Sequence, residues 1–141
     1  MYQAISLFIL ETIRGRRNDD FEEFYMLILV ADKRSRIRFA LRLLIEQATG
    51  HTIVAEVEDA ESLTTKIRET LPDLVLLEWE LSQEINGKVI SSLKEDHPQM
   101  KVVVLSGQPK WRKAALNAGA VDFVSKGDSP DRLMMMLNRY E

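Results

Sequence analysis

The sequence predicts an α/β domain of three layers, in which five parallel strands lie between two layers of helices. From residue 25 onward, short runs rich in Val, Ile and Leu alternate with stretches of helical period, which is typical of strand–helix units around a parallel sheet. Right-handed crossovers between five such units most simply produce a doubly wound sheet of order 2-1-3-4-5, with ligands bound beyond the carboxyl ends of the strands. The predicted strands are residues 26–30, 52–57, 74–79, 101–105 and 121–125.

The composition of each run predicts its place in the sheet. MLILV, LVLLEW and KVVVL are apolar runs, as central strands covered on both faces must be, whereas TIVAEV and VDFVS carry polar residues and suit the edges. The helices between the strands should bury apolar residues on the sheet. Those residues are Ile37, Leu41, Leu44 and Ile45 in the first helix, Leu63 and Ile67 in the second, Val89, Ile90 and Leu93 in the third, and Ala114 and Ala115 in the fourth.

The last helix is expected to begin after residue 129. Ser129 can cap the free N–H groups of the first turn, Pro130 suits the first helical position, and Asp131 complements the positive end of the helix dipole. We expect this helix to continue through LMMMLNRY to the end of the chain.

Residues 1–24 are predicted to be a helical extension and linker, and residues 25–141 the domain itself. Apolar residues recur at helical spacing in the extension before the polar segment RGRRNDD. We expect the extension to pack on its own domain or to be an upstream start with no structural role, and a dimer contact or a membrane-surface contact is the alternative.

Composition excludes several classes of function. The 141-residue chain has no cysteine, which excludes disulfides, a thiol nucleophile and thiolate metal sites and is compatible with a cytoplasmic location. Its net charge is -3 and it has no apolar run long enough to cross a bilayer, so neither nucleic acid nor membrane is an expected partner. The basic first helix is expected to be a solvated face, and His51 and His97 are expected at the surface.

Polar side chains collect where the predicted strands end. Asp32 follows the first strand, Glu78 lies at the end of the third, Ser106 follows the fourth, and Lys126 follows the fifth. Because the carboxyl ends of parallel strands share one edge of the sheet, two carboxylates, a hydroxyl and an ammonium should converge there. Any one of these residues alone is more simply structural, but the set indicates a site.

This set resembles the receiver domain of response regulators in two-component (phosphorelay) signalling. The resemblance covers about residues 25 to 140 and implies a flavodoxin-like fold, and its closing SPDRL helix is similar to receivers that precede helix-turn-helix output domains. Because the chain ends at Glu141, we expect a stand-alone receiver. The motifs that carry the resemblance are VADK (30–33), PDLVLLEWEL (72–81), ING (85–87), VVVLSG (102–107), NAGAVDFVSKG (117–127) and SPDRL (129–133).

The resemblance implies a role for each site residue. In the family, an acidic pair and an Asp hold Mg²⁺, that Asp accepts a phosphoryl group from a histidine kinase, and the hydroxyl and lysine bind the phosphoryl oxygens. Asp32 matches the second acid of the pair, Ser106 the hydroxyl, Lys126 the lysine, and Phe123 the switch aromatic. Two positions depart from the pattern: Ala31 replaces the first acid, and Glu78 replaces the phosphoacceptor.

These departures predict a degenerate receiver. The extra methylene of Glu78 displaces its carboxylate, and in-line phosphoryl transfer tolerates little misplacement, so phosphorylation should be slow or absent. Ala31 removes a hard oxygen ligand, which leaves at best a weak Mg²⁺ site on Asp32 and Glu78. Glu78 could reach Ser106 and Lys126 as a partial phosphoryl mimic, or it could simply pair with Lys126 in a static binding module.

The segment from Ser106 to Lys126 is a further departure, because it is about two residues shorter than in the receivers the chain resembles. The loss falls in the loop and helix that start at Gln108 and Pro109, a stretch that carries Trp111 and that moves on activation in the family. Pro109 fixes one backbone dihedral, so this segment is expected to move less.

We therefore expect a stand-alone, non-enzymatic receiver-like signalling domain that acts through protein–protein contacts and requires no cofactor. The expected partner is a signalling protein or a histidine kinase, with a homodimer as a further possibility through the face of the fourth helix, fifth strand and fifth helix. One alternative is a phosphorylation-competent phosphorelay receiver with a relaxed site. Another is a small α/β enzyme that uses Glu78 and Asp32 as acid and base.

Overall fold

The predicted sheet and its strand order are confirmed. The computed structural model describes residues 25–81 and 86–140. Its five strands are all parallel and lie in the order β2-β1-β3-β4-β5, with the two polar strands at the edges as expected. Their bounds are β1 Leu27–Ala31, β2 Thr52–Val57, β3 Leu74–Glu78, β4 Lys101–Ser106 and β5 Asp122–Ser125.

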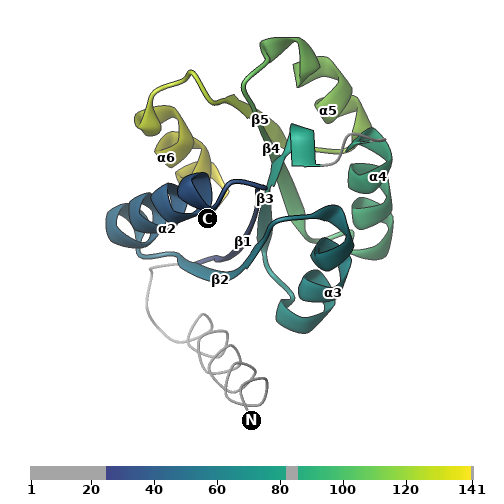
Figure 1. Cartoon of the computed structure of the whole chain (residues 1–141), viewed down its shortest axis with the longest axis horizontal. Coiled ribbons are helices and arrows are strands. Elements are labelled where there is room, and N and C mark those ends of the chain that lie inside the picture. The colour runs from purple at the N-terminus through teal and green to yellow at the C-terminus, as the bar shows by residue number, and fades with distance from the viewer. Residues whose placement is uncertain (1–24, 82–85, 141) are drawn as a thin grey trace.

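Helices cover both faces of the sheet (Figure 1). Helices α2 (Ser35–Thr49) and α6 (Pro130–Arg139) pack on one face, and α3 (Ala60–Thr70), α4 (Asn86–Asp96) and α5 (Arg112–Ala118) pack on the other. Two short 3₁₀ turns follow central strands, η1 (Trp79–Leu81) after β3 and η2 (Pro109–Trp111) after β4. Both turns therefore lie at the carboxyl edge of the sheet, where the polar residues were predicted to meet.

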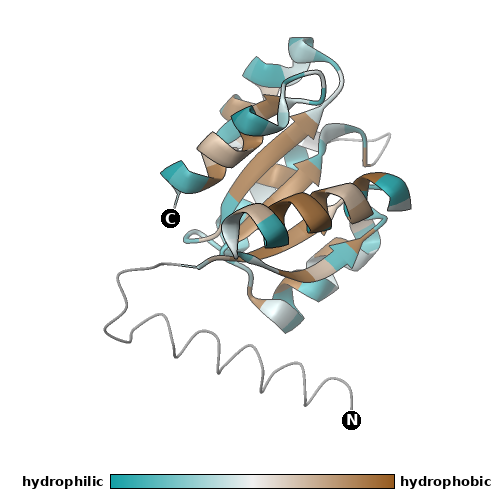
Figure 2. Cartoon of the chain, turned by 90° about the vertical axis from the view of Figure 1, so that its left-hand side faces the viewer, coloured by the Kyte–Doolittle hydropathy of each residue, from teal (hydrophilic) through white to brown (hydrophobic). Residues whose placement is uncertain are grey.

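The sheet divides the apolar core into two clusters. Alternate residues of β1 point to opposite faces, so that Ile28 packs with Ile45 and Met136 on the side of α2 and α6, while Leu29 packs with Leu63 and Ile90 on the other. Figure 2 shows the central strands as an apolar layer with hydrophilic segments on the outer helices. Of the three predicted core residues of the third helix, Ile90 and Leu93 are buried, whereas Val89 is partly buried.

Three local predictions were wrong. Ser129 occupies the N-cap position of α6, but its side chain makes no capping hydrogen bond. His51 is buried and not at the surface, because Gly50 (φ 79°) turns the chain after α2 and the His51 Nδ1 then accepts the Met26 N–H at 3.0 Å. Ala114 is exposed, whereas its neighbour Ala115 is fully buried.

Part of the sequence lies outside the described residues. The predicted extension, residues 1–24, belongs to that part. In the ranges 25–81 and 86–140, every helix is too short or too polar to cross a lipid bilayer.

Candidate functional site

The carboxyl edge of the sheet brings together the residues predicted to form the site. Asp32 directly follows β1 and is 1% exposed, and Glu78 is the last residue of β3 and is 6% exposed. Lys126 lies just beyond β5, and its Nζ is 3.2 Å from Asp32 Oδ2 and 3.0 Å from Glu78 Oε1. A single ammonium therefore bridges two buried carboxylates that come from different strands.

A second cation completes this arrangement. The Arg34 guanidinium lies 3.5 Å from Asp32 Oδ1 and 3.5 Å from Glu78 Oε1. Backbone N–H groups also donate to the carboxylates, from Arg34 to Asp32 Oδ1 at 2.9 Å and from Lys33 to Glu78 Oε2 at 3.2 Å. Buried charges need such partners, and here two carboxylates are compensated by two cations.

The partners of Asp32 also affect its protonation. Burial by itself would raise the pKa of Asp32, but the hydrogen bond from the Arg34 N–H and the positive charge of Lys126 outweigh it and lower that pKa below its ordinary value. Asp32 is therefore an ionised partner of Lys126 at neutral pH.

Ser106 is engaged by a different carboxylate. Its hydroxyl, at the end of β4 and 0% exposed, donates to Glu80 Oε1 at 2.6 Å, and the Gln108 N–H donates to Ser106 Oγ at 3.1 Å. Glu78 was predicted to lie within reach of both Ser106 and Lys126, but its described side-chain contacts are with Lys33, Arg34 and Lys126. Glu80 is thus a site residue that the sequence analysis missed.

The local fold explains why Glu80 reaches Ser106. In a continued strand, residues 78 and 80 would point to the same face. Instead the chain turns at η1 directly after Glu78, and Trp79 and Leu81, both 7% exposed, anchor this turn in the core. The Glu-Trp-Glu sequence at residues 78–80 already indicates a second acid near Glu78. The direction of the Glu80 side chain, however, depends on the η1 turn.

The side chains at this edge do not fit a magnesium ion. Within the described ranges, no group of three or more Asp, Glu, His or Cys residues is placed to hold a metal. The two carboxylates predicted as ligands, Asp32 and Glu78, share the Lys126 ammonium, which repels a divalent cation. Mg²⁺ prefers near-octahedral oxygen ligation, and this cation-filled pair does not supply it.

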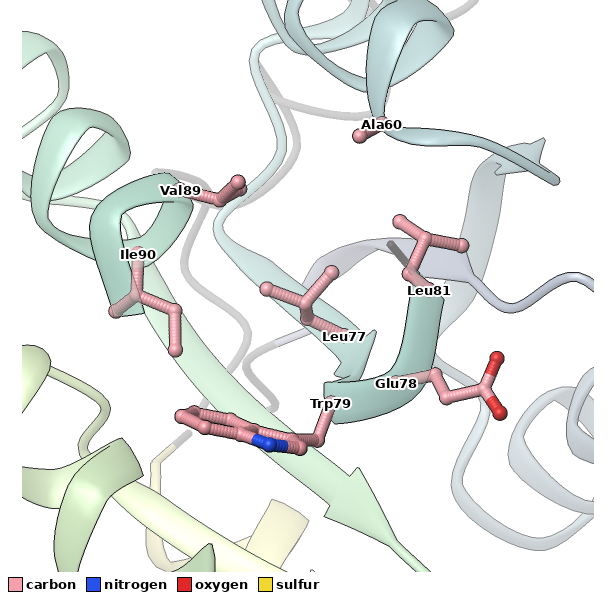
Figure 3. A pocket seen from close by; sticks show the side chains of 7 residues that line it. All are labelled: Ala60, Leu77, Glu78, Trp79, Leu81, Val89 and Ile90. Atoms are coloured by element: carbon pink, nitrogen blue, oxygen red, sulfur yellow. The ribbon is translucent and has the colours of Figure 1, made fainter. Parts of the chain in front are cut away.

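A small cavity beside Glu78 bears on the enzyme alternative. Its volume is about 10 Å³, which is room for about one water molecule. Figure 3 shows the Glu78 carboxylate pointing away from the apolar side chains of Val89 and Ile90 that line this cavity. A larger cavity of about 330 Å³ lies near Leu71 and His97, before the first residues of β3 and β4 and thus at the opposite edge of the sheet. Neither described cavity offers a substrate-sized space next to the two predicted acid and base residues.

The shortened segment after β4 is attached to the rest of the domain at several points. Trp111 stacks on Trp79, with ring centroids 5.5 Å apart and planes 24° apart. Arg112 Nη1 donates to the Phe123 carbonyl oxygen at 3.2 Å. The Phe123 ring is 2% exposed and belongs to the same apolar cluster as Ala115 of α5. The predicted switch aromatic thus points into the core.

The basic face of α2 is largely paired. Arg42 contacts Glu56 of β2 at 2.6 Å and Glu46 at 2.9 Å, and Arg38 lies 3.4 Å from Glu56. Arg38 also donates to the backbone carbonyl of Asp32 at 2.7 Å. This pairing favours the interpretation of α2 as an ordinary charged face.

Comparison with known proteins identifies relatives along most of the chain. The family model described as "Response regulator receiver domain" matches residues 28–138. The chemotaxis protein CheY of Thermotoga maritima is 30% identical over 115 residues, which cover 79% of this chain and 94% of CheY. The crystal structure of the receiver domain of NtrX from Brucella abortus superposes with a TM-score of 0.71 at 29% identity, covering 80% of this chain and 96% of that one.

Longer proteins are matched only in part. BvgA of Bordetella pertussis, named as a transcription regulator of virulence factors, is 31% identical over 107 residues, which cover 74% of this chain and 51% of BvgA. The chain thus spans about half the length of the first such relatives it matches.

Proposed function

Because the chain belongs to the response-regulator receiver family, we propose that it is a signalling domain that acts through protein–protein contacts and is not switched by phosphorylation. One observation carries this proposal: Glu78 stands at the end of β3, where the family has its phosphoacceptor Asp, and its carboxylate is held by Lys126 at 3.0 Å and by Arg34 at 3.5 Å. The reacting position is therefore filled by an internal ion pair.

The chemistry of phosphoryl transfer supports this proposal. The attacking oxygen, the phosphorus and the leaving oxygen must lie in line, and a displacement of about 1 Å can lower the rate on the order of a hundredfold. The carboxylate of Glu lies one methylene farther from the backbone than that of Asp. Ala31 contributes no oxygen ligand beside Asp32, and the domain is proposed to need no Mg²⁺.

The proposed partner is another signalling protein or a histidine kinase. A homodimer through α5, β5 and α6 stays a secondary proposal. The exposed Met135 on α6 supports contact at this face, because its side chain is 64% exposed and methionine adapts to varied apolar surfaces. The buried Asp122 of β5 pairs with Arg132 and Arg139 of α6 at 3.8 and 3.6 Å, so that β5 and α6 are in contact at this face.

The test is intact mass spectrometry after incubation with acetyl phosphate and Mg²⁺, with the Glu78→Asp variant treated in parallel. We expect no phosphoryl adduct on the native protein. An adduct that appears only on the variant would assign the loss to the extra methylene of Glu78. An adduct on the native protein would overturn the proposal and favour a phosphorelay receiver with a relaxed site.

A further inference from the structure

We infer that the carboxylates of Glu78 and Glu80 together substitute for a phosphoryl group. Glu78 accepts a hydrogen bond from the Lys126 ammonium, and Glu80 accepts one from the Ser106 hydroxyl. This inference rests on the proposed function, because it assumes that the carboxyl edge of the sheet is the signalling site. It makes Glu80 a positioning residue, because the hydrogen bond between Ser106 and Glu80 holds the segment after β4 in its present position.

The first step of the argument is the contact between Glu80 and Ser106. A fully buried hydroxyl needs a hydrogen-bond partner, and Ser106 has a single O–H to donate. It donates that hydrogen to Glu80 Oε1 at 2.6 Å, a short distance typical of a charge-assisted bond to a carboxylate. The hydroxyl has no second hydrogen for another anion.

The second step concerns charge and the number of oxygens. A phosphorylated side chain carries about −1.5 to −2 charges and three terminal acceptor oxygens, and one carboxylate supplies only one charge and two oxygens. Glu78 alone would therefore be a partial mimic. Together Glu78 and Glu80 supply two charges and four oxygens, and each satisfies one of the two donors, Lys126 and Ser106, that the site presents.

The third step connects this contact to the shortened segment. The Gln108 N–H bonds to the same Ser106 oxygen, and three residues later Trp111 stacks on Trp79, the neighbour of Glu80. The η1 turn and the segment 106–111 are thus joined both by the Glu80–Ser106 hydrogen bond and by the indole stack. Loosening the hydrogen bond should loosen the stack.

Both tryptophans of the chain lie in that stack, which makes the connection measurable. The coupled circular-dichroism signal of two stacked indoles reports their mutual geometry. The experiment compares Glu80→Ala, Glu80→Gln, Ser106→Ala and the double variant Glu80→Ala/Ser106→Ala. Glu95→Ala, which removes an exposed carboxylate of α4, is the matched control.

We expect Glu80→Ala and Ser106→Ala to weaken the indole signal, and Glu80→Gln to restore part of it because the amide oxygen can still accept the hydroxyl hydrogen. Urea denaturation of the four proteins in the Glu80–Ser106 cycle should give a coupling of about tenfold in the unfolding equilibrium constant. Additive effects together with an unchanged indole signal in Glu80→Ala would overturn the inference.

These measurements use no phosphodonor, so they can fail independently of the proposed function. A second arm uses the Glu78→Asp variant after phosphorylation. We expect its indole signal to change on phosphorylation only when Glu80→Ala is also present, because Ser106 is otherwise held by Glu80. The same change with Glu80 intact would overturn the inference, and a failure of both Glu78→Asp and Ala31→Asp/Glu78→Asp to take a phosphoryl group would instead count against the proposed role of Glu78.

Discussion

Lys126→Met should strongly destabilise the domain. The substitution keeps most of the side-chain volume but removes the ammonium that lies 3.2 Å from Asp32 and 3.0 Å from Glu78. Removing one partner of a buried ion pair typically costs about 3–5 kcal/mol, because the remaining charge stays buried. The Lys126 side chain is 21% exposed and Arg34 remains nearby, so we expect a loss at the low end, about 3 kcal/mol.

Equilibrium denaturation in urea measures this loss. With a slope of about 1.5 kcal/mol per molar urea, typical of small domains, the midpoint should fall by about 2 M. Arg34→Ala is the matched control. The Arg34 side chain is 53% exposed and lies 3.5 Å from both Asp32 and Glu78, so its removal should reduce the free energy of unfolding by less than about 1 kcal/mol.

A double variant tests the cause of the loss. Glu78→Gln removes one of the two charges that Lys126 compensates, so its combination with Lys126→Met should recover at least about half of the lost stability. A midpoint shift of less than about 0.5 M for Lys126→Met, or no recovery in the double variant, would refute the account of the paired charges.

Two further predictions concern stability. Because the pKa of Asp32 is lowered in the folded state, its ionised form stabilises the fold above the ordinary pKa of 3.8, and this stability is lost as the pH falls through the lower pKa of the folded state. Asp32→Asn should therefore flatten the acid limb of a plot of unfolding free energy against pH. An unchanged acid limb would contradict the role of ionised Asp32 in stability. Leu71→Gly should raise the free energy of unfolding by about 0.5–1 kcal/mol, because Leu71 has a left-handed backbone conformation (φ 46°) that favours glycine. A lower thermal midpoint in this variant would contradict that reasoning.

The parts of the structure that follow from periodicity could be predicted from the sequence. Continuous apolar runs identified the central strands, and polar residues identified β2 and β5 as the edges. Strand ends then located the site, since the carboxyl ends of parallel strands share one edge. This topology predicted that Asp32, Glu78 and Lys126 would converge, and the structure places the Lys126 ammonium 3.2 Å from Asp32 and 3.0 Å from Glu78.

The contacts that depend on local turns could not be predicted in the same way. The 3₁₀ turn that begins at Trp79 decides whether Glu78 or Glu80 accepts the hydrogen bond from the Ser106 hydroxyl. The spacing of apolar residues in the sequence does not predict such a short turn. His51 stands between Gly50 and Thr52 in the sequence, and only the turn at Gly50 buries it against Met26 at the amino end of β1. Tertiary placement decides such cases.

The central claim is that the carboxylates of Glu78 and Glu80 occupy the place of a phosphoryl group. Its most direct test is a titration of the native protein with Mg²⁺ and beryllofluoride, a phosphoryl analogue, in which ¹H–¹⁵N NMR spectra monitor the backbone amide signals. The informative amides are those of Arg34 and Gln108, which donate to Asp32 and Ser106, and that of Lys126. We expect these signals to stay in place in the native protein and to shift saturably in an Ala31→Asp/Glu78→Asp/Glu80→Ala variant, which regains the oxygen ligand beside Asp32 that Mg²⁺ needs. Saturable shifts in the native protein would show that the site is open to a phosphoryl group and would contradict the account.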